Sequence, residues 1–120
     1  MSGTRRRKAQ PGEAIELTTF KITGSLRDFI AANADVDAWL ATQPGFRMRR
    51  IAEQEDGTVI DLLLWDSVAH GERAAERLLV ELRDSPVHAR IQQRTVKWRV
   101  LSVDTHVTEG DFTFRVSEGR

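Results

Sequence analysis

The stretch Thr58-Val-Ile-Asp-Leu-Leu-Leu-Trp65 decides the fold. In an extended chain, alternate side chains point to opposite faces. One face then carries Val59, Asp61, Leu63 and Trp65. The other face is wholly apolar, with Ile60, Leu62 and Leu64. Because a sheet with one solvated face alternates apolar and polar residues, this stretch predicts a central strand in a sheet that is covered on both sides.

The turn signal Glu55-Asp56-Gly57 joins this strand to a preceding strand over residues 46–54. A two-residue loop would place Met48 and Arg50 on the face of Asp61. A three-residue loop with a bulge at Gly57 would instead place Arg47, Arg49 and Ile51 there. We favour the second register, because it allows Arg49 to pair with Asp61.

Two more strands and two helices flank this hairpin. The apolar phase of the strand at residues 14–22 shifts, which indicates a bulge or bend near Thr18. An apolar stripe at helical spacing then predicts a helix to about Ala41, with a kink or a second short helix at residues 33–37. Ser67 caps a helix that runs to about residue 84, a short helical turn follows Ser85-Pro86, and residues 95–104 form the last strand.

This order of elements predicts an α+β, ferredoxin-like βαββαβ fold: a four-stranded antiparallel sheet with two helices on one face. The first and third strands lie at its centre. We expect the face away from the helices to carry Leu63, Trp65 and part of the last strand, which is too apolar to remain solvated. A second copy related by two-fold symmetry would cover that face, so the chain is expected to form a homodimer.

The 120 residues make one domain, with 18 basic and 18 acidic residues and no cysteine. This balance gives no field toward nucleic acid or an anionic membrane, and disulfides and thiolate chemistry are excluded. Without a long apolar run or a signal core, we expect a cytoplasmic protein. Residues 1–13 read as a disordered basic tail, 14–104 as the domain, and 105–120 as an extension that forms an edge strand or a dimer arm.

Two segments carry a resemblance to a known family: Asp37-Ala-Trp-Leu-Ala-Thr-Gln-Pro-Gly-Phe46 and Asp56-Gly-Thr-Val-Ile-Asp-Leu-Leu-Leu-Trp-Asp-Ser67, followed by an alanine-rich helix. With them, residues 14–104 resemble the dimeric α+β barrel superfamily typified by antibiotic biosynthesis monooxygenase-like proteins. The resemblance implies a homodimer whose paired sheets form a barrel, with a cavity between sheet and helices in each subunit. Cofactor-free oxygenases of this family commonly use asparagine, tryptophan and tyrosine. Trp65 matches the tryptophan, but tyrosine is absent and the only asparagine, Asn33, lies on the first helix.

Asp61 is the sharpest candidate for a functional residue, because a carboxylate on an apolar central strand is costly unless it is paired. Either it forms an ion pair with Arg49, Arg50 or Arg99, or it is a general base. His70, at the start of the second helix, is the second candidate base.

Trp39, Trp65 and Trp98 are either core and interface residues or walls of a ligand pocket, and Arg49 is a further candidate for substrate binding. The three histidines lack metal-ligand spacing, and no glycine-rich phosphate loop is present, so no metal and no cofactor are predicted.

Two functions of different class follow. The first is a homodimeric barrel that binds a small apolar or aromatic metabolite without turnover. The second is a cofactor-independent monooxygenase or isomerase-like enzyme that uses Asp61 or His70 as its base and Trp65 as a wall. We favour the first, because the family's catalytic residues do not align with this chain.

Overall fold

A computed structural model describes residues 7–8 and 13–107. Its main sheet is antiparallel and four-stranded, in the order β3-β4-β2-β5. The strands are β2 (Ala14–Phe20), β3 (Phe46–Glu53), β4 (Val59–Trp65) and β5 (Lys97–Ser102). The predicted first and third strands, β2 and β4, lie at the centre. The α+β fold and its four-stranded sheet are therefore confirmed.

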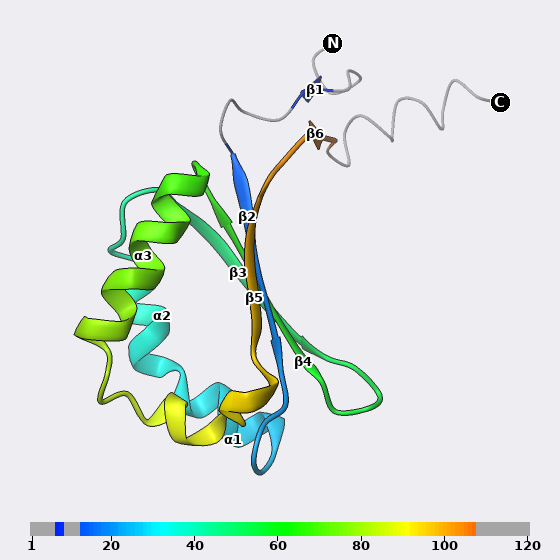
Figure 1. Cartoon of the computed structure of the whole chain (residues 1–120), viewed down its shortest axis with the longest axis vertical. Coiled ribbons are helices and arrows are strands. Elements are labelled where there is room, and N and C mark those ends of the chain that lie inside the picture. Colours follow the sequence, from blue (N-terminus) through cyan, green and yellow to red (C-terminus); the bar gives the residue numbers. More distant parts are fainter. Residues whose placement is uncertain (1–6, 9–12, 108–120) are drawn as a thin grey trace, which may run out of the picture.

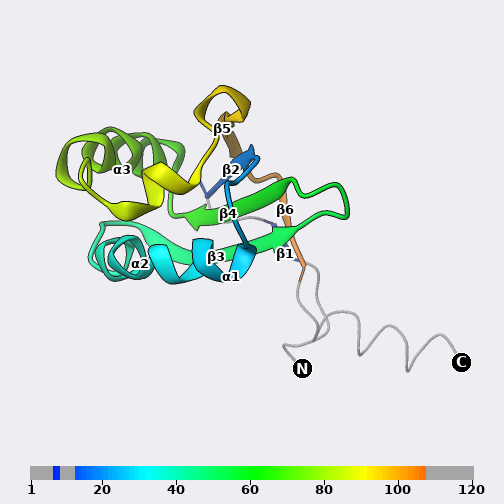
Figure 2. The same cartoon turned by 90° about the horizontal axis from the view of Figure 1, so that it is seen from below.

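Three α-helices, rather than the two predicted, cover one side of this sheet (Figures 1 and 2). They are α1 (Leu26–Ala32), α2 (Ala34–Leu40) and α3 (Val68–Glu81), followed by the 3-10 helices η1 (Pro86–Arg90) and η2 (Gln93–Thr95). The predicted first helix breaks at Asn33, whose side-chain amide donates to the Phe29 carbonyl at 2.8 Å. The cap at Ser67 occurs as predicted, since Ser67 Oγ accepts from the His70 backbone N–H at 3.1 Å.

The β3–β4 hairpin has the register that we favoured. Ile51 pairs with Asp61 and Arg49 with Leu63, so both β3 residues share the face of Asp61. The backbone N–H of Gln54 donates to Thr58 O at 2.8 Å across the turn. Gly57 closes this three-residue loop at a φ of +87°, a conformation that favours glycine.

A bulge lies at the other end of the hairpin, between Phe46 and Met48. It turns Arg47 away from Asp61 and into an ion pair with Glu13, a residue that is buried. Arg47 is therefore not on the face of Asp61 as expected, because the extra residue of the bulge shifts the alternation of the strand there.

The predicted bulge near Thr18 is wrong. β2 pairs with β4 in unbroken register from Ala14 opposite Trp65 to Phe20 opposite Val59. The apolar phase shifts for another reason: the inward side chains of this regular strand include Glu16 as well as Phe20. A polar group on the inner face disturbs the hydrophobic pattern as a bulge would, although the backbone is regular.

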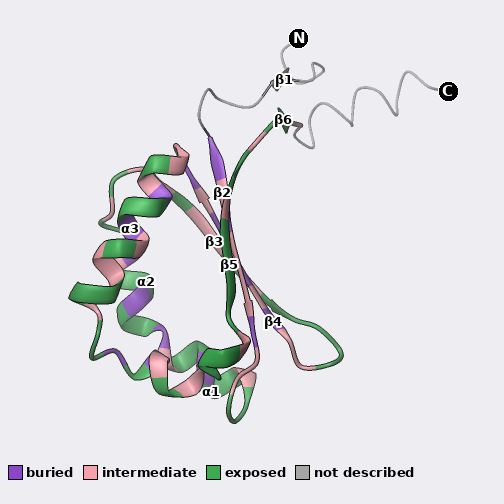
Figure 3. Cartoon of the chain, viewed as in Figure 1, coloured by how far each residue is buried: buried purple, intermediate pink, exposed green. Residues whose placement is uncertain are grey.

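The assignment of Leu63 and Trp65 to the uncovered face is also wrong. Both are buried beneath the helices, with Trp65 only 1% exposed, and they belong to the core together with Phe20, Phe29, Val36 and Leu40. Along β4, buried residues alternate with intermediate ones (burial is coloured in Figure 3), and by this alternation the intermediate residues belong to the face away from the helices. That face carries the apolar residues Ile15, Leu17, Met48, Ile60, Leu62, Leu64 and Leu101, together with the charged residues Arg50, Lys97 and Arg99.

A second ladder of two short strands pairs β1 (Arg7–Lys8) with β6 (Thr105–His106). β1 lies in the segment predicted as the basic tail, and β6 lies in the predicted C-terminal extension. The remainder of the tail up to residue 12, and residues 108–120 of the extension, lie outside the described residues. Within the described part of the chain, each helix is too short or too polar to cross a lipid bilayer.

Candidate ligand-binding site

A cavity of about 680 Å³ lies between the inner face of the sheet and the helices. Strands β2, β4 and β5 contribute apolar or aromatic side chains to its wall, and β3 contributes Arg49. The helices add Phe29 from α1, Trp39 from α2 and Leu78 from α3. The cavity is thus a largely apolar space into which a few polar side chains project.

Five of the six candidate residues line this cavity: Arg49, Asp61, Trp39, Trp65 and Trp98. His70 is not among the lining residues. Its Nδ1 atom lies 2.7 Å from Ser67 Oγ, and its ring packs against Gly45, outside the cavity wall. The fold therefore brings together three tryptophans from distant parts of the chain, and it places the histidine elsewhere.

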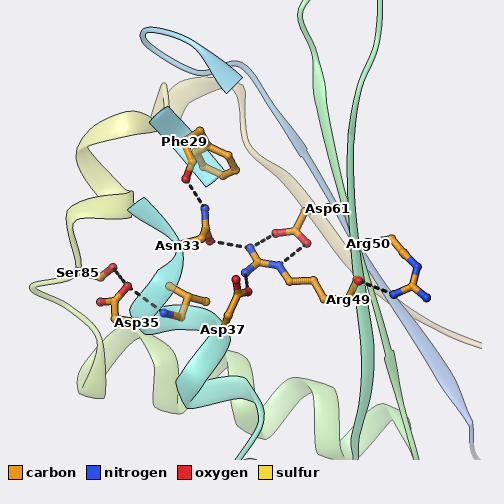
Figure 4. Close-up of polar contacts among 9 residues, drawn as sticks. Phe29, Asn33, Asp35, Asp37, Arg49, Arg50, Asp61 and Ser85 are labelled. Atoms are coloured by element: carbon orange, nitrogen blue, oxygen red, sulfur yellow. Dashed lines mark hydrogen bonds and ion pairs between the residues drawn. The ribbon is translucent and has the colours of Figure 1, made fainter. Parts of the chain in front are cut away.

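Arg49 and Asp61 form the predicted ion pair (Figure 4). Arg49 Nε and Nη2 donate to the two oxygens of Asp61 at 3.0 and 2.7 Å. The same guanidinium donates to Asp37 Oδ1 at 2.7 Å and to Asn33 Oδ1 at 2.9 Å. Because a guanidinium has five N–H donors in a planar fork, one arginine joins β4 to the break between α1 and α2.

The electrostatics of this cluster favour the charged pair. Burial alone would lower the pKa of Arg49, but the hydrogen bond and the charge of Asp61, and then those of Asp37, outweigh burial and raise that pKa. Arg50 lies on the opposite side of β3 and, among the residues that the structure describes, donates to the backbone oxygen of Arg49 alone, at 2.9 Å (Figure 4). Arg49 rather than Arg50 is therefore the partner of Asp61.

Glu16 is the residue that reasoning from the sequence missed. It lies on β2, is 9% exposed, and accepts hydrogen bonds from two indoles. Trp65 Nε1 donates to its Oε1 at 2.8 Å, and Trp98 Nε1 donates to its Oε2 at 2.6 Å. Burial raises the pKa of Glu16 above its usual value, against the opposing effect of these two hydrogen bonds, and the charge of Asp61 raises it further.

A signal for Glu16 is present in the sequence, since an acidic residue lies on the first strand two positions before Thr18. The predicted shift of apolar phase near Thr18 rests on the apolar residues of that strand and assigns no role to Glu16. Its indole partners lie 49 and 82 residues further along the chain. Such pairings depend on the strand register, so the sequence pattern alone offered no partner for this carboxylate.

Two of the carboxylates that line the cavity are buried, and their partners differ. Asp61 forms a bidentate ion pair with Arg49, whereas Glu16 accepts from two uncharged indoles and feels the charge of Arg49 without a hydrogen bond to it. Because burial raises the pKa of Glu16, its carboxylate is a stronger proton acceptor than an exposed one. Across residues 7–8 and 13–107, no group of three or more His, Cys, Asp or Glu side chains is arranged to hold a metal ion.

The α+β fold is shared with solved structures of monooxygenases, as the resemblance implied for the fold. The chain is similar to SnoaB, a cofactor-independent oxygenase from Streptomyces nogalater, with a TM-score of 0.65 and 18% identity over 82% of this chain and 99% of SnoaB. It is also similar to the monooxygenase ActVA-Orf6 of Streptomyces coelicolor, solved with nanaomycin D, with a TM-score of 0.62 and 18% identity over 81% of this chain and 92% of that one. At this identity the likeness establishes the fold.

Comparison of the sequence with models of protein families identifies a family other than the one that the structural likeness suggests. A family model described as the CopC domain matches residues 47–117, more than half of the chain, and the chain belongs to that family. The match begins within β3, so it excludes β2, α1 and α2, which supply Glu16 and Asn33. We therefore interpret the site from the fold, whose likeness covers 82% of the chain. No protein of curated function matches the sequence.

Proposed function

We propose that this protein binds a small aromatic molecule in the cavity between its sheet and its helices. The observation that carries the proposal is the lining of a space of about 680 Å³: three tryptophans and further apolar side chains surround two buried carboxylates, of which Asp61 is paired with Arg49. Ligand sites are typically concave and apolar, with a few polar groups that orient the ligand. Indole rings add favourable contacts with flat aromatic molecules beyond simple burial of apolar surface.

Calorimetric titration with 2-naphthol, a neutral bicyclic probe, tests this proposal. Ala75 lines the cavity, so Ala75→Trp should fill it and abolish binding. Ala69→Trp is the matched control, because Ala69 also lies on α3 but is exposed and does not line the cavity. Binding that survives Ala75→Trp, or that is absent from the unmodified protein, would contradict the proposal.

The proposed assembly is a homodimer in which two sheets pack through their helix-free faces. This face is apolar along the central strands β2 and β4, where Met48 of β3 and Leu101 of β5 extend it, and Leu101 is 49% exposed in the single chain. Arg50, Lys97 and Arg99 lie on the same face, on the two outer strands. A contiguous apolar face of this kind marks an interaction surface. A second copy would cover it with an identical face, as two-fold symmetry requires.

Light scattering after size exclusion tests the dimer. The expected mass is about twice 13.6 kDa. Leu62 lies near the middle of the helix-free face, so Leu62→Lys should give the monomer mass while the chain remains folded. Leu79→Lys is the control, since Leu79 is exposed on α3 and outside that face. A monomeric unmodified protein would refute the assembly.

A second candidate function is cofactor-independent oxygenation of the bound molecule. It is supported by the fold shared with SnoaB, which is described as a cofactor-independent oxygenase, and by a buried carboxylate that can accept a proton. The test is incubation of hydroxyaromatic compounds with isotopically labelled dioxygen, followed by mass spectrometry of the products. Label incorporation equal to that in protein-free buffer would exclude this function.

A further inference from the structure

We propose that Glu16 is the proton-accepting group of this cavity, that the indoles of Trp65 and Trp98 position its carboxylate, and that its negative charge excludes anionic ligands. The inference rests on the proposed binding of an aromatic ligand and assigns the polar end of that site. It applies to ligands that carry a ring hydroxyl, because such a group can donate a hydrogen bond or a proton to a carboxylate.

The positioning follows from the sheet order. Glu16 pairs with Leu63 of β4 on one side and with Val100 of β5 on the other, so its side chain lies between those two strands on the inner face. Trp65 and Trp98 reach it from the two neighbouring strands and donate to different oxygens, at 2.8 and 2.6 Å. An ionised carboxylate has about four acceptor positions. Two hydrogen bonds therefore fix its orientation and leave acceptor capacity for a ligand in the cavity that Glu16 lines.

The charges that face this carboxylate come from every wall of the cavity. They are Asp61 on β4, Arg49 on β3, Glu72 and Glu76 on α3, and His88 on η1. Arg49 donates to Asp61 and Asp37, and its charge is therefore already balanced. His88 Nε2 lies 2.8 Å from the Leu82 carbonyl oxygen, so that ring nitrogen already has a hydrogen-bond partner. The lining consequently has an excess of negative charge, and a carboxylate ligand would meet repulsion there.

A purely structural role explains Glu16 poorly. Burying a carboxylate that forms no ion pair with the described residues is costly, and hydrogen bonds from two uncharged indoles offset only part of that cost. Burial also raises the pKa of Glu16, which makes its carboxylate a stronger proton acceptor than an exposed one. A group that is costly to the fold and suited to proton transfer is typical of a functional site.

The proton-transfer step conserves atoms and charge. The O–H bond of the ligand hydroxyl breaks, and its electron pair stays on the ligand oxygen. The proton forms a new bond to a free lone pair of the Glu16 carboxylate, which becomes neutral. The total charge of cavity and ligand is unchanged, so the step introduces no additional buried charge.

Calorimetric titration of the full chain with 2-naphthol and with 2-naphthoate tests the inference, because the two probes share a ring and differ in charge. The unmodified protein should bind 2-naphthol at least about tenfold more tightly than 2-naphthoate. In Glu16→Gln, we expect the affinity for 2-naphthol to fall by about tenfold and the affinity for 2-naphthoate to rise. Ala75→Trp, measured in parallel, reports whether either probe occupies the cavity.

Trp98→Phe separates a positioning role from a structural one. The hydrogen bond from Trp98 lowers the pKa of Glu16, so its removal should raise the pH at which 2-naphthol binding weakens through protonation of Glu16. A structural role would change affinity at all pH values without moving that midpoint. This measurement also decides the case if Glu16→Gln fails to fold, because Trp98→Phe retains the carboxylate.

The outcomes distinguish this inference from the proposed function. If 2-naphthol binds in the cavity but Glu16→Gln leaves the preference over 2-naphthoate unchanged, or Trp98→Phe leaves the pH midpoint unchanged, the role of Glu16 is overturned and ligand binding stands. If 2-naphthol does not bind the unmodified protein, or binds equally to Ala75→Trp, both proposals are overturned.

Discussion

Replacement of Arg49 by methionine should destabilise this protein more than replacement of any other charged residue of β3. The side chains of Arg49 and Asp61 are each 12% exposed, and two hydrogen bonds of 3.0 and 2.7 Å join them. Methionine keeps much of the length of the side chain but removes every donor. Asp61 would then remain in a largely apolar cavity, with Glu16 on the neighbouring strand and no cation beside it.

The magnitude follows from which partners are buried. Removing one member of a buried ion pair costs about 3–5 kcal/mol, because the remaining charge stays desolvated. The lost contact to Asp37 adds little, since that carboxylate is 58% exposed and is screened by solvent. A loss of this size corresponds to a fall in Tm of about 10 °C or more for a domain of this length.

Guanidinium chloride unfolding at neutral pH measures this change, and Arg50→Met is the matched control. Arg50 is the next residue, is exposed, and bonds only to a backbone oxygen, so its replacement should cost less than about 0.5 kcal/mol. In the Arg49→Met background, Asp61→Asn should be neutral or stabilising, which gives a coupling of about 2 kcal/mol or more. Equal effects of Arg49→Met and Arg50→Met, or a coupling near zero, would refute the reasoning.

Three further changes test other parts of the structure. The folded-state pKa of Glu16 is raised above 4.5, so the stabilisation that its protonation provides is lost as pH rises through that folded-state pKa. In urea titrations, the unfolding free energy of the unmodified protein relative to that of Glu16→Gln should therefore fall between about pH 4 and about pH 8. A constant difference would contradict this. Gly45→Ala should lower the free energy of unfolding by about 2–4 kcal/mol, because φ is +79° and the new Cβ would lie 2.4 Å from His70 Cγ. Gly57→Ala is the control: its φ is +87° but nothing lies within 4 Å of the new Cβ, so it should cost about 1 kcal/mol. Similar costs in chemical unfolding would exclude the contact with His70. Asn33→Ala should lower Tm through a loss of about 1–3 kcal/mol, because it removes an acceptor from Arg49 and a donor to the Phe29 carbonyl, and an unchanged Tm would show that the helix break needs neither.

The polar groups on the two sides of the cavity have different roles. On one side, Arg49 joins Asp61 to the break between α1 and α2, which stabilises the wall formed by the helices. On the other side, Trp65 and Trp98 hold Glu16 without neutralising it. Trp98 is 47% exposed, so this end of the cavity is also the end nearer to solvent on β5. A ligand would thus meet its polar partner between two aromatic rings.

The sequence by itself determined the elements that depend on local patterns. The apolar run at residues 59–65 predicted a central strand, and the turn at Gly57 predicted the hairpin register that brings Arg49 beside Asp61. The weak helical propensity around Asn33 indicated the break between α1 and α2. These features are set by side-chain alternation, turn geometry and helix propensity within a few residues, and they can therefore be derived before the fold is known.

Only the tertiary structure decided which face of the sheet the helices cover and what surrounds Glu16. Alternation shows that Leu63 and Trp65 share a face with Asp61, but it does not show on which side of the sheet the crossover helices pack. The partners of Glu16 lie 49 and 82 residues away in the chain, on the strands either side of β2. Contacts of this range depend on strand order and long-range register, which arise from packing the whole chain, so the candidate base became visible only once β4, β2 and β5 were placed side by side.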